Sequence, residues 1–245
     1  QEIIFFVSLF VLIYFLRTVT HDVSKDAKKK ILAAAIVIFI FRAMPAVGPG
    51  MQWWQIDVLG FDKAFFGTLA QIGAGLAIVG MWFLAKYITE QSIAKIFIVL
   101  TVISTILSLP VLGMYYGLHE WTDAVFGFGA RTIALVDTAL ASPFVQLSMI
   151  PMLTLIAANA PRGNAATWFA LMASLMNLAL TAGSLLSKWM NHVWVVTRQV
   201  KDVSGAIVTN ANYSQLGVLM WISILAGFLL PILSIYIFMR NDLRK

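Results

Sequence analysis

Two charged residues, Arg42 and Asp137, lie deep inside long apolar stretches of the sequence. Arg42 is about eleven residues into its stretch, or about 16 Å along a helix. A charge at that depth in a bilayer costs about 2.5–3.5 kcal/mol on insertion scales, so it is expected to face protein or water and to find a partner. Asp137 is the carboxylate expected to pair with it. We favour a substrate or proton site over the alternative, a permanent salt bridge between helices.

Three uncharged polar residues complete the set of candidate binding or coupling residues. Gln71 and Gln146 are single amides within apolar stretches, where each either packs through a hydrogen bond or lines a pore. Asn177 belongs to a stripe of small and polar residues at helical spacing. The stripe consists of Ala170, Ser174, Asn177, Thr181 and Ser184. Such a stripe lines a cavity or packs closely on a neighbouring helix, and packing is the favoured interpretation.

The sequence offers little for catalysis. It has no cysteine, and its three histidines are scattered. No paired-histidine zinc motif, nucleophile elbow or phosphate loop is present. Gly73, Gly75 and Gly80 follow no predicted strand, so they are expected to allow close helix packing and not nucleotide binding. We therefore predict no catalytic residue, no cofactor, no metal and no enzymatic activity.

These residues must be positioned by membrane-spanning helices. Of the 245 residues, 60% are hydrophobic and 11% are charged, whereas soluble domains average about 45–50% and about 25%. The apolar residues gather in blocks close to the 20 or so residues that span a bilayer, without the alternation of a β-barrel. The fold class is therefore all-α, a polytopic transmembrane bundle of about seven spans. The expected spans are residues 2–19, 31–48, 64–88, 93–116, 128–158, 166–190 and 216–239.

The basic residues predict the orientation in the membrane. They concentrate in the loops at 20–30 and 159–165 and in the tail at 240–245, and such an excess marks the cytoplasmic side. Arg131, at the other side, is expected to anchor a helix end at the interface. The net charge of +6 thus reflects topology and not nucleic-acid binding. The protein is expected in a plasma (inner) or organelle membrane, such as the thylakoid, with a cytoplasmic C-terminus.

A family resemblance rests on the stretch APRGNAATWFALMASLMN at residues 160–177. It is similar to the segment between the tenth and eleventh helices of folate–biopterin transporters, which belong to the major facilitator superfamily. Asp137 and Pro151 in the preceding helix also match that family. The stretch from Phe41 through Pro45 to Phe61 is similar as well. The resemblance covers roughly residues 31–239.

This resemblance implies a major-facilitator-type C-terminal half. Residues 1–30 would be the last helix of a missing N-terminal half with a short basic loop, and residues 31–245 a six-span bundle. The implied function is proton-coupled secondary transport of a small, anionic, pterin- or folate-like solute by alternating access. Arg42 would attract the anion and Asp137 would carry the proton. The partners would be the bilayer, the solute and the missing half. The alternative is a non-transporting membrane subunit that packs within a larger complex.

Overall fold

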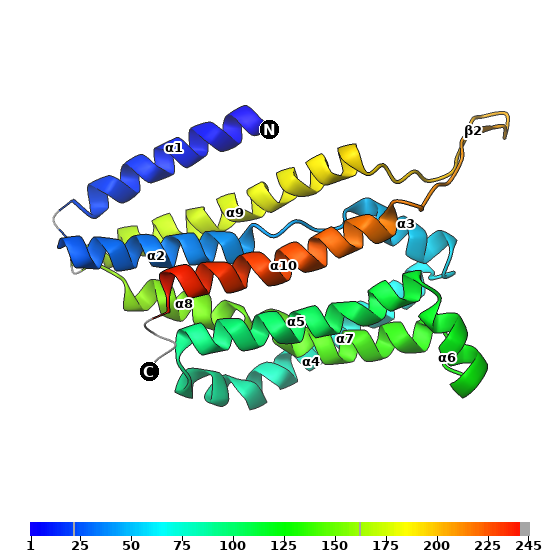
Figure 1. Ribbon diagram of the computed structural model, residues 1–245, viewed down its shortest axis with the longest axis horizontal. Coiled ribbons are helices and arrows are strands. Elements are labelled where there is room, and N and C mark those ends of the chain that lie inside the picture. Colours follow the sequence, from blue (N-terminus) through cyan, green and yellow to red (C-terminus); the bar gives the residue numbers. More distant parts are fainter. Residues whose placement is uncertain (22, 162, 241–245) are drawn as a thin grey trace.

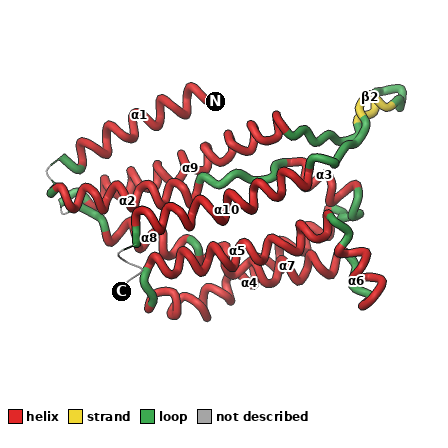
Figure 2. The backbone as a smooth tube through the Cα atoms, viewed as in Figure 1, coloured by secondary structure: helices red, strands yellow, loops and turns green. Residues whose placement is uncertain are grey.

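Helices form about three-quarters of the protein. A computed structural model describes residues 1–21, 23–161 and 163–240, with the side chains of residues 85 and 87–90 outside the described part. In chain order the helices are α1 (Glu2–Val19), α2 (Lys25–Arg42), α3 (Pro49–Asp57), α4 (Lys63–Glu90), α5 (Ile93–Tyr115), α6 (Leu118–Phe126), α7 (Ala130–Leu147), α8 (Met149–Ala158), α9 (Ala165–Val193) and α10 (Leu216–Phe238). A small antiparallel hairpin, β1 (Val200–Lys201) and β2 (Ile207–Thr209), projects between α9 and α10 (Figure 2).

Six membrane-length spans are found among the described residues, one fewer than the sequence predicted. They are α1, most of α4, α5, α7 with α8, α9 and α10. Their bounds lie within about three residues of those expected. The predicted span at residues 31–48 is the exception, because α2 ends at Arg42 and its first turns carry four lysines. The eleven apolar residues in between, 31–41, are too few to cross a bilayer as a helix.

Proline stops α2 early. Pro45 has no backbone N–H to donate and disfavours the helical conformation at Met44, and α2 ends here, although α5, α7 and α10 continue through internal prolines. Residues 43–48 are accordingly non-helical. Gly48 then adopts a positive φ of 93°, and α3 begins with Pro49 in its first turn. The chain therefore crosses the bundle as a helix, an extended segment and a second short helix.

The helices pack side by side as shown in Figure 1. α4 lies along α7, α5 lies along both α7 and α10, and α2 fits between α9 and α10. Gly73 and Gly80 lie against α7, where a methyl group at Gly80 would overlap Pro143. This confirms the expected close packing at Gly73 and Gly80, whereas Gly75 has nothing within 4 Å and does not pack in this way among the described residues. In the largest core cluster Trp168 is fully buried, and its indole Nε1 donates to the carbonyl of Ile156 at 2.8 Å.

The span at 130–158 is interrupted near its middle. Pro151 cannot donate to the carbonyl of Leu147, and the helix is broken at Ser148 into α7 and α8. The loops predicted to share one side, at 20–30 and 159–165, lie together at one end of the bundle (Figure 1). The hairpin, α3 and α6 lie at the opposite end. The grouping of the loops thus follows the sequence pattern, and the membrane side that each end faces stays a prediction.

Candidate functional site

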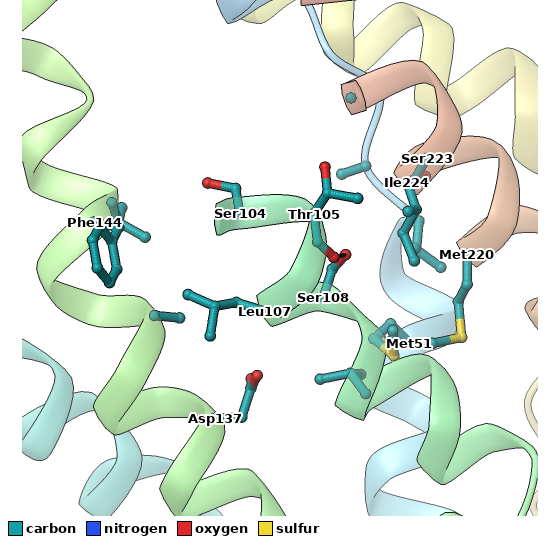
Figure 3. A pocket seen from close by; sticks show the side chains of 16 residues that line it. Met51, Ser104, Thr105, Leu107, Ser108, Asp137, Phe144, Met220, Ser223 and Ile224 are labelled. Atoms are coloured by element: carbon teal, nitrogen blue, oxygen red, sulfur yellow. Dashed lines mark hydrogen bonds between the residues drawn. The ribbon is translucent and has the colours of Figure 1, made fainter. Parts of the chain in front are cut away.

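A cavity of about 500 Å³ lies among α5, α7, α10 and the start of α3. This volume falls in the range of roughly 300–1,000 Å³ typical of small-molecule sites. The described residues that line it are mostly apolar, with a few convergent polar groups (Figure 3). The polar members are Ser104, Thr105, Ser108, Asp137 and Ser223. A mainly apolar wall with a few placed polar groups is the usual composition of a ligand site.

Asp137 projects from α7 into this cavity (Figure 3). Its Oδ1 is buried, and it accepts no hydrogen bond from the described part of the chain. A carboxylate in an apolar setting is costly unless it is neutralised or hydrogen-bonded. Asp137 therefore needs a proton or a donor group from a ligand, which makes it the chemically reactive position in the cavity.

Hydroxyl groups face Asp137 from the other helices. On α5, Thr105 donates to the carbonyl of Thr101 at 2.8 Å and Ser108 to that of Thr105 at 2.7 Å. Because their protons are engaged, these oxygens face the cavity chiefly as acceptors. On α10, Ser223 has a buried Oγ without a partner among the described residues. The cavity thus offers a carboxylate, the hydroxyl acceptors of Thr105 and Ser108, and two hydroxyls, of Ser104 and Ser223, that have no partner among the described residues.

The non-helical segment 43–48 forms one wall, through Ala46 and Val47. Its backbone groups would be unsatisfied in a membrane, and α9 supplies their partners. The Ala46 N–H donates to the Ser187 Oγ at 2.8 Å, and the Asn191 Nδ2 donates to the Val47 carbonyl at 2.9 Å. One turn earlier, Gly183 lets α9 approach the segment closely. Together these three α9 positions hold the broken helix in place.

Arg42 lies outside the cavity and does not pair with Asp137. Its Nη1 contacts the Met149 Sδ at 3.6 Å, and its buried Nε has no partner in the described structure. Met149 follows Asp137 by twelve residues, which is about 18 Å at helical rise. The two charges therefore lie at different depths. The ion pair predicted from the sequence is absent from this conformation, and the roles proposed for each residue stay predictions.

The three other candidates lie on outer faces of the bundle. Gln71 on α4, Gln146 on α7 and Asn177 on α9 are exposed, and none lines the cavity. The side chains of the stripe around Asn177 are exposed in the described part of the chain, so the packing interpretation stays a prediction. Ser174, Thr181 and Ser184 each donate to the carbonyl four residues earlier on α9.

Sequence reasoning missed the cavity hydroxyls. A signal was present, because Thr101, Thr105 and Ser108 recur at helical spacing within one apolar span. Such hydroxyls commonly bond their own helix backbone, so spacing alone does not separate a lining residue from an inert one.

A polar cluster closes the hairpin end of the bundle. Asp57, at the end of α3, accepts two hydrogen bonds from Arg198, at 2.9 and 2.7 Å, and a third from Tyr213 at 2.5 Å. Donation by Arg198 and Tyr213 lowers the pKa of Asp57 below its usual value. Burial, together with the bond to Asp57, raises the pKa of Tyr213 to about 12. This cluster ties α3 to both arms of the α9–α10 loop.

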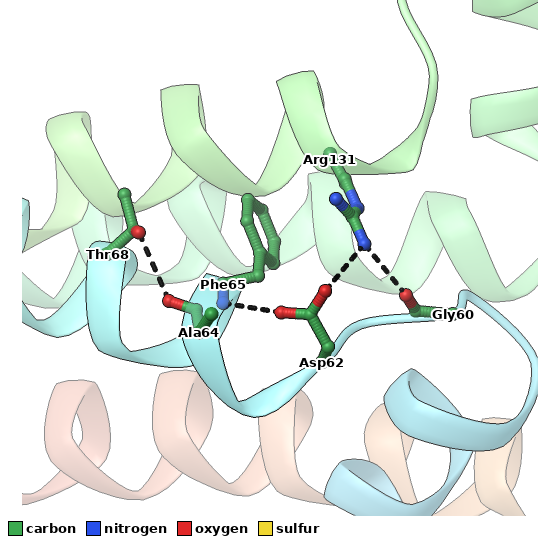
Figure 4. Close-up of polar contacts among 6 residues, drawn as sticks. All are labelled: Gly60, Asp62, Ala64, Phe65, Thr68 and Arg131. Atoms are coloured by element: carbon green, nitrogen blue, oxygen red, sulfur yellow. Dashed lines mark hydrogen bonds and ion pairs between the residues drawn. The ribbon is translucent and has the colours of Figure 1, made fainter.

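A second ion pair at this end fixes α7 to the start of α4 (Figure 4). The Arg131 Nη2 binds Asp62 at 3.2 Å and the Gly60 carbonyl at 3.1 Å, and its guanidinium lies over the Phe65 ring at 5.2 Å. Asp62 also accepts from the Phe65 N–H at 2.7 Å and thereby caps α4. Arg131 is exposed and holds a helix end, as its sequence position predicted.

Six membrane-length spans among the described residues, three of which line the cavity, define a multi-pass membrane protein. The chain belongs to the BT1 family, whose family model matches residues 6–244. This match confirms the resemblance that residues 160–177 suggested.

Two curated relatives carry transporter names. The chain is 28% identical over 193 residues to the "Folate-biopterin transporter" of Synechocystis sp., covering 77% of this chain and 37% of that protein. It is 27% identical over 175 residues to "Probable folate-biopterin transporter 4" of Arabidopsis thaliana, covering 70% and 34%. The chain thus spans about a third of the length of these relatives. No solved structure matches it.

Proposed function

We propose that the chain forms part of a secondary transporter for a small organic solute of the pterin or folate type. Membership of the BT1 family and the names of the two relatives support the solute class. The single observation that carries the proposal is Asp137, whose buried, unpaired oxygen faces a cavity of about 500 Å³. In this proposal residues 31–245 are the six-span module, whose first span is the discontinuous crossing made by α2, the segment 43–48 and α3. Residues 1–30 are the last helix and loop of the preceding half.

Asp137 has two roles in the proposed cycle. It carries the coupling proton in one conformation, and it accepts a hydrogen bond from the solute in another. A pterin ring bears adjacent N–H donors along its amino-pyrimidine edge, and a carboxylate accepts such a pair well. Arg42, whose Nε is buried without a described partner, attracts the anionic part of the solute when the path opens towards it. Gln71, Gln146 and Asn177 remain candidates for contacts on the outer faces.

The broken helix at 43–48 supports alternating access around this cavity. Discontinuous helices commonly form the midplane sites of transporters, where the rocking of two halves exposes the site to each side in turn. Here the non-helical segment supplies part of the cavity wall at Ala46 and Val47. Movement of α3 relative to α2 would then open or close the cavity.

Uptake into proteoliposomes tests the proposal. The protein, expressed as its gene encodes it, is assayed with a panel of pterins, folates and unrelated organic anions, with and without an inward proton gradient. We expect gradient-stimulated uptake of pterins or folates, lost in Asp137→Asn and kept in the matched control Asp123→Asn on α6. A folded protein that moves none of these solutes would contradict transport and favour the alternative, a structural subunit of a membrane complex.

Cysteine labelling tests the orientation separately. The chain has no native cysteine, so single cysteines at Ser24, Asn164 and Ser204 report their own positions. If the basic loops are cytoplasmic, an impermeant thiol reagent outside intact cells labels only the cysteine at Ser204. Labelling at Ser24 or Asn164 would reverse the proposed orientation without affecting the transport proposal.

A further inference from the structure

A second cavity, of about 440 Å³, lies where α4 ends and α5 begins. Its described lining comes from α5, from Leu84 near the end of α4 and from Phe144 and Leu147 of α7. It is separate from the Asp137 cavity, although Phe144 contributes to both. Nothing in the proposed transport cycle uses it.

One end of this cavity is polar and the rest of its described lining is apolar. Lys95 and Gln91 lie at the loop end, and the remaining described lining residues are apolar. Val99 and Ile103 follow Lys95 at four-residue spacing, so one face of α5 carries a cation and then apolar side chains for about 12 Å. The Lys95 ammonium is exposed and forms no ion pair or hydrogen bond with the described residues.

The cavity opens sideways as well as at its end. Val99, midway along it, is 49% exposed, whereas Ile96 and Leu100 on the adjacent face of α5 are buried. In a membrane-spanning bundle, an apolar opening on the flank of a helix meets hydrocarbon chains. Lys95 lies in the first turn of α5, and basic side chains at the ends of membrane-spanning helices lie at headgroup level.

We propose that this cavity binds one anionic phospholipid, with an acyl chain between α5 and α7 and the phosphate at Lys95. The apolar lining matches the chain, and the unpaired ammonium matches the phosphate charge. Basic pockets between transmembrane helices are known to take anionic headgroups. Gln91 adds an amide donor at the mouth. The site lies at the end of the bundle that carries the basic loops, which attract anionic lipid to the same surface.

Native mass spectrometry in a neutral detergent tests the headgroup contact. The purified protein is titrated with phosphatidylglycerol and with phosphatidylcholine of the same acyl chains. Lys95→Ala should weaken phosphatidylglycerol binding about fivefold and leave phosphatidylcholine unchanged, the effect of one lysine near an anionic surface. Lys95→Arg should retain binding. Lys201→Ala, an exposed lysine at the opposite end, is the matched control and should change nothing. Unaltered phosphatidylglycerol selectivity in Lys95→Ala would refute the site.

The acyl chain is tested by two further arms. Val99→Trp fills the cavity and should reduce retention of both lipids, whereas Val200→Trp on the exposed hairpin should not. Glycerol 3-phosphate, which has the charge but no chain, should not bind at the concentrations that saturate phosphatidylglycerol. If glycerol 3-phosphate bound equally well, the lipid proposal would be wrong and the cavity would be a site for a soluble anion. Thermal unfolding of each variant identifies misfolding, and the exposed Lys95 variants keep the test decisive if Val99→Trp fails to fold.

Discussion

The hairpin end and the interior of the bundle differ in whether their charged side chains have partners among the described residues. At the hairpin end Asp57 pairs with Arg198 and Asp62 with Arg131. In the interior, the Asp137 Oδ1 and the Arg42 Nε are buried without described partners. Paired charges at a surface hold loops and helix ends together. Unpaired charges inside a membrane protein destabilise the conformation in which they are unpaired, so a ligand, a proton or another conformation must supply what they lack.

The largest expected effect comes from removing the interior carboxylate. Asp137→Asn should lower solute affinity or uptake by roughly tenfold to a hundredfold, the loss of one hydrogen bond to a charged group. Its thermal stability should equal or exceed that of the parent, because no described residue loses a partner. Uptake and thermal unfolding of the same preparation measure both. A large loss of stability with Asp137→Asn would mean that Asp137 is a structural residue. It would contradict the difference proposed here between paired charges at the hairpin end and an unpaired charge in the interior.

The broken helix sharpens the comparison, because it lies in the interior and yet two of its backbone groups, at Ala46 and Val47, find partners on α9. A methyl group at Gly183 would lie 2.8 Å from the Met44 carbonyl oxygen. Gly183→Ala should therefore displace the segment at 43–48 and cost about 1–3 kcal/mol through overpacking. Gly227→Ala on α10, where nothing lies within 4 Å, is the matched control and should be neutral or stabilising. Equal unfolding temperatures would show that α9 does not support the segment.

At the end opposite the hairpin, a turn depends on backbone conformation and not on side-chain chemistry. Gly163 has a φ of +83°, and the Asn164 N–H bonds the Pro161 carbonyl at 3.3 Å. Gly163→Val should cost about 1–2 kcal/mol because a branched side chain is strained at positive φ. Asn164→Ala should stay within about 0.5 kcal/mol. Expression level and unfolding temperature provide the measurement, and similar values for both variants would contradict the turn.

The smallest effect is expected at the hairpin cluster, because partly exposed ion pairs contribute little. The folded pKa of Asp57 is lowered, so its stabilisation is complete above the ordinary carboxyl value and is lost as pH falls through the lower folded value. Asp57→Asn should speed amide exchange in the 194–215 loop near neutral pH, and the parent should approach the variant in acid. Asp123→Asn is the control. The quantity compared is the protection factor, which removes the intrinsic effect of pH on amide exchange. If the protection factors of the parent loop do not fall in acid, Asp57 does not stabilise the loop.

Most helices could be predicted because apolar block length decides them. The crossing that begins at Ile31 is not the continuous helix expected, because Pro45 lies inside its apolar block and α2 ends at Arg42. Hydropathy does not register a missing N–H. The same break put Arg42 near Met149 and away from Asp137. Which group pairs with a buried charge depends on the depth of each residue in the membrane, to within about one helical turn. Span boundaries expected from sequence carry an error of about the same size, so they cannot identify the partner.

The site was predictable only in part. Asp137 stood out because a carboxylate in an apolar span is rare and costly. The lining hydroxyls did not, because a serine or threonine that bonds its own helix looks the same in sequence wherever it points. The hairpin cluster joins Asp57 to residues more than 140 positions later. A sequence pattern over neighbouring residues cannot predict a contact between residues so far apart in the chain.

The hydroxyl stripe on α9 has a mechanical consequence. Ser174, Thr181 and Ser184 donate their hydroxyl protons to carbonyls of their own helix, and the exposed amide of Asn177 lies between them. A partner helix that shifted along this face would break no hydrogen bond donated by these three hydroxyls. Apart from the Asn177 amide, the face meets such a partner through hydroxyl acceptors and van der Waals contact, so a small shift in register changes few hydrogen bonds.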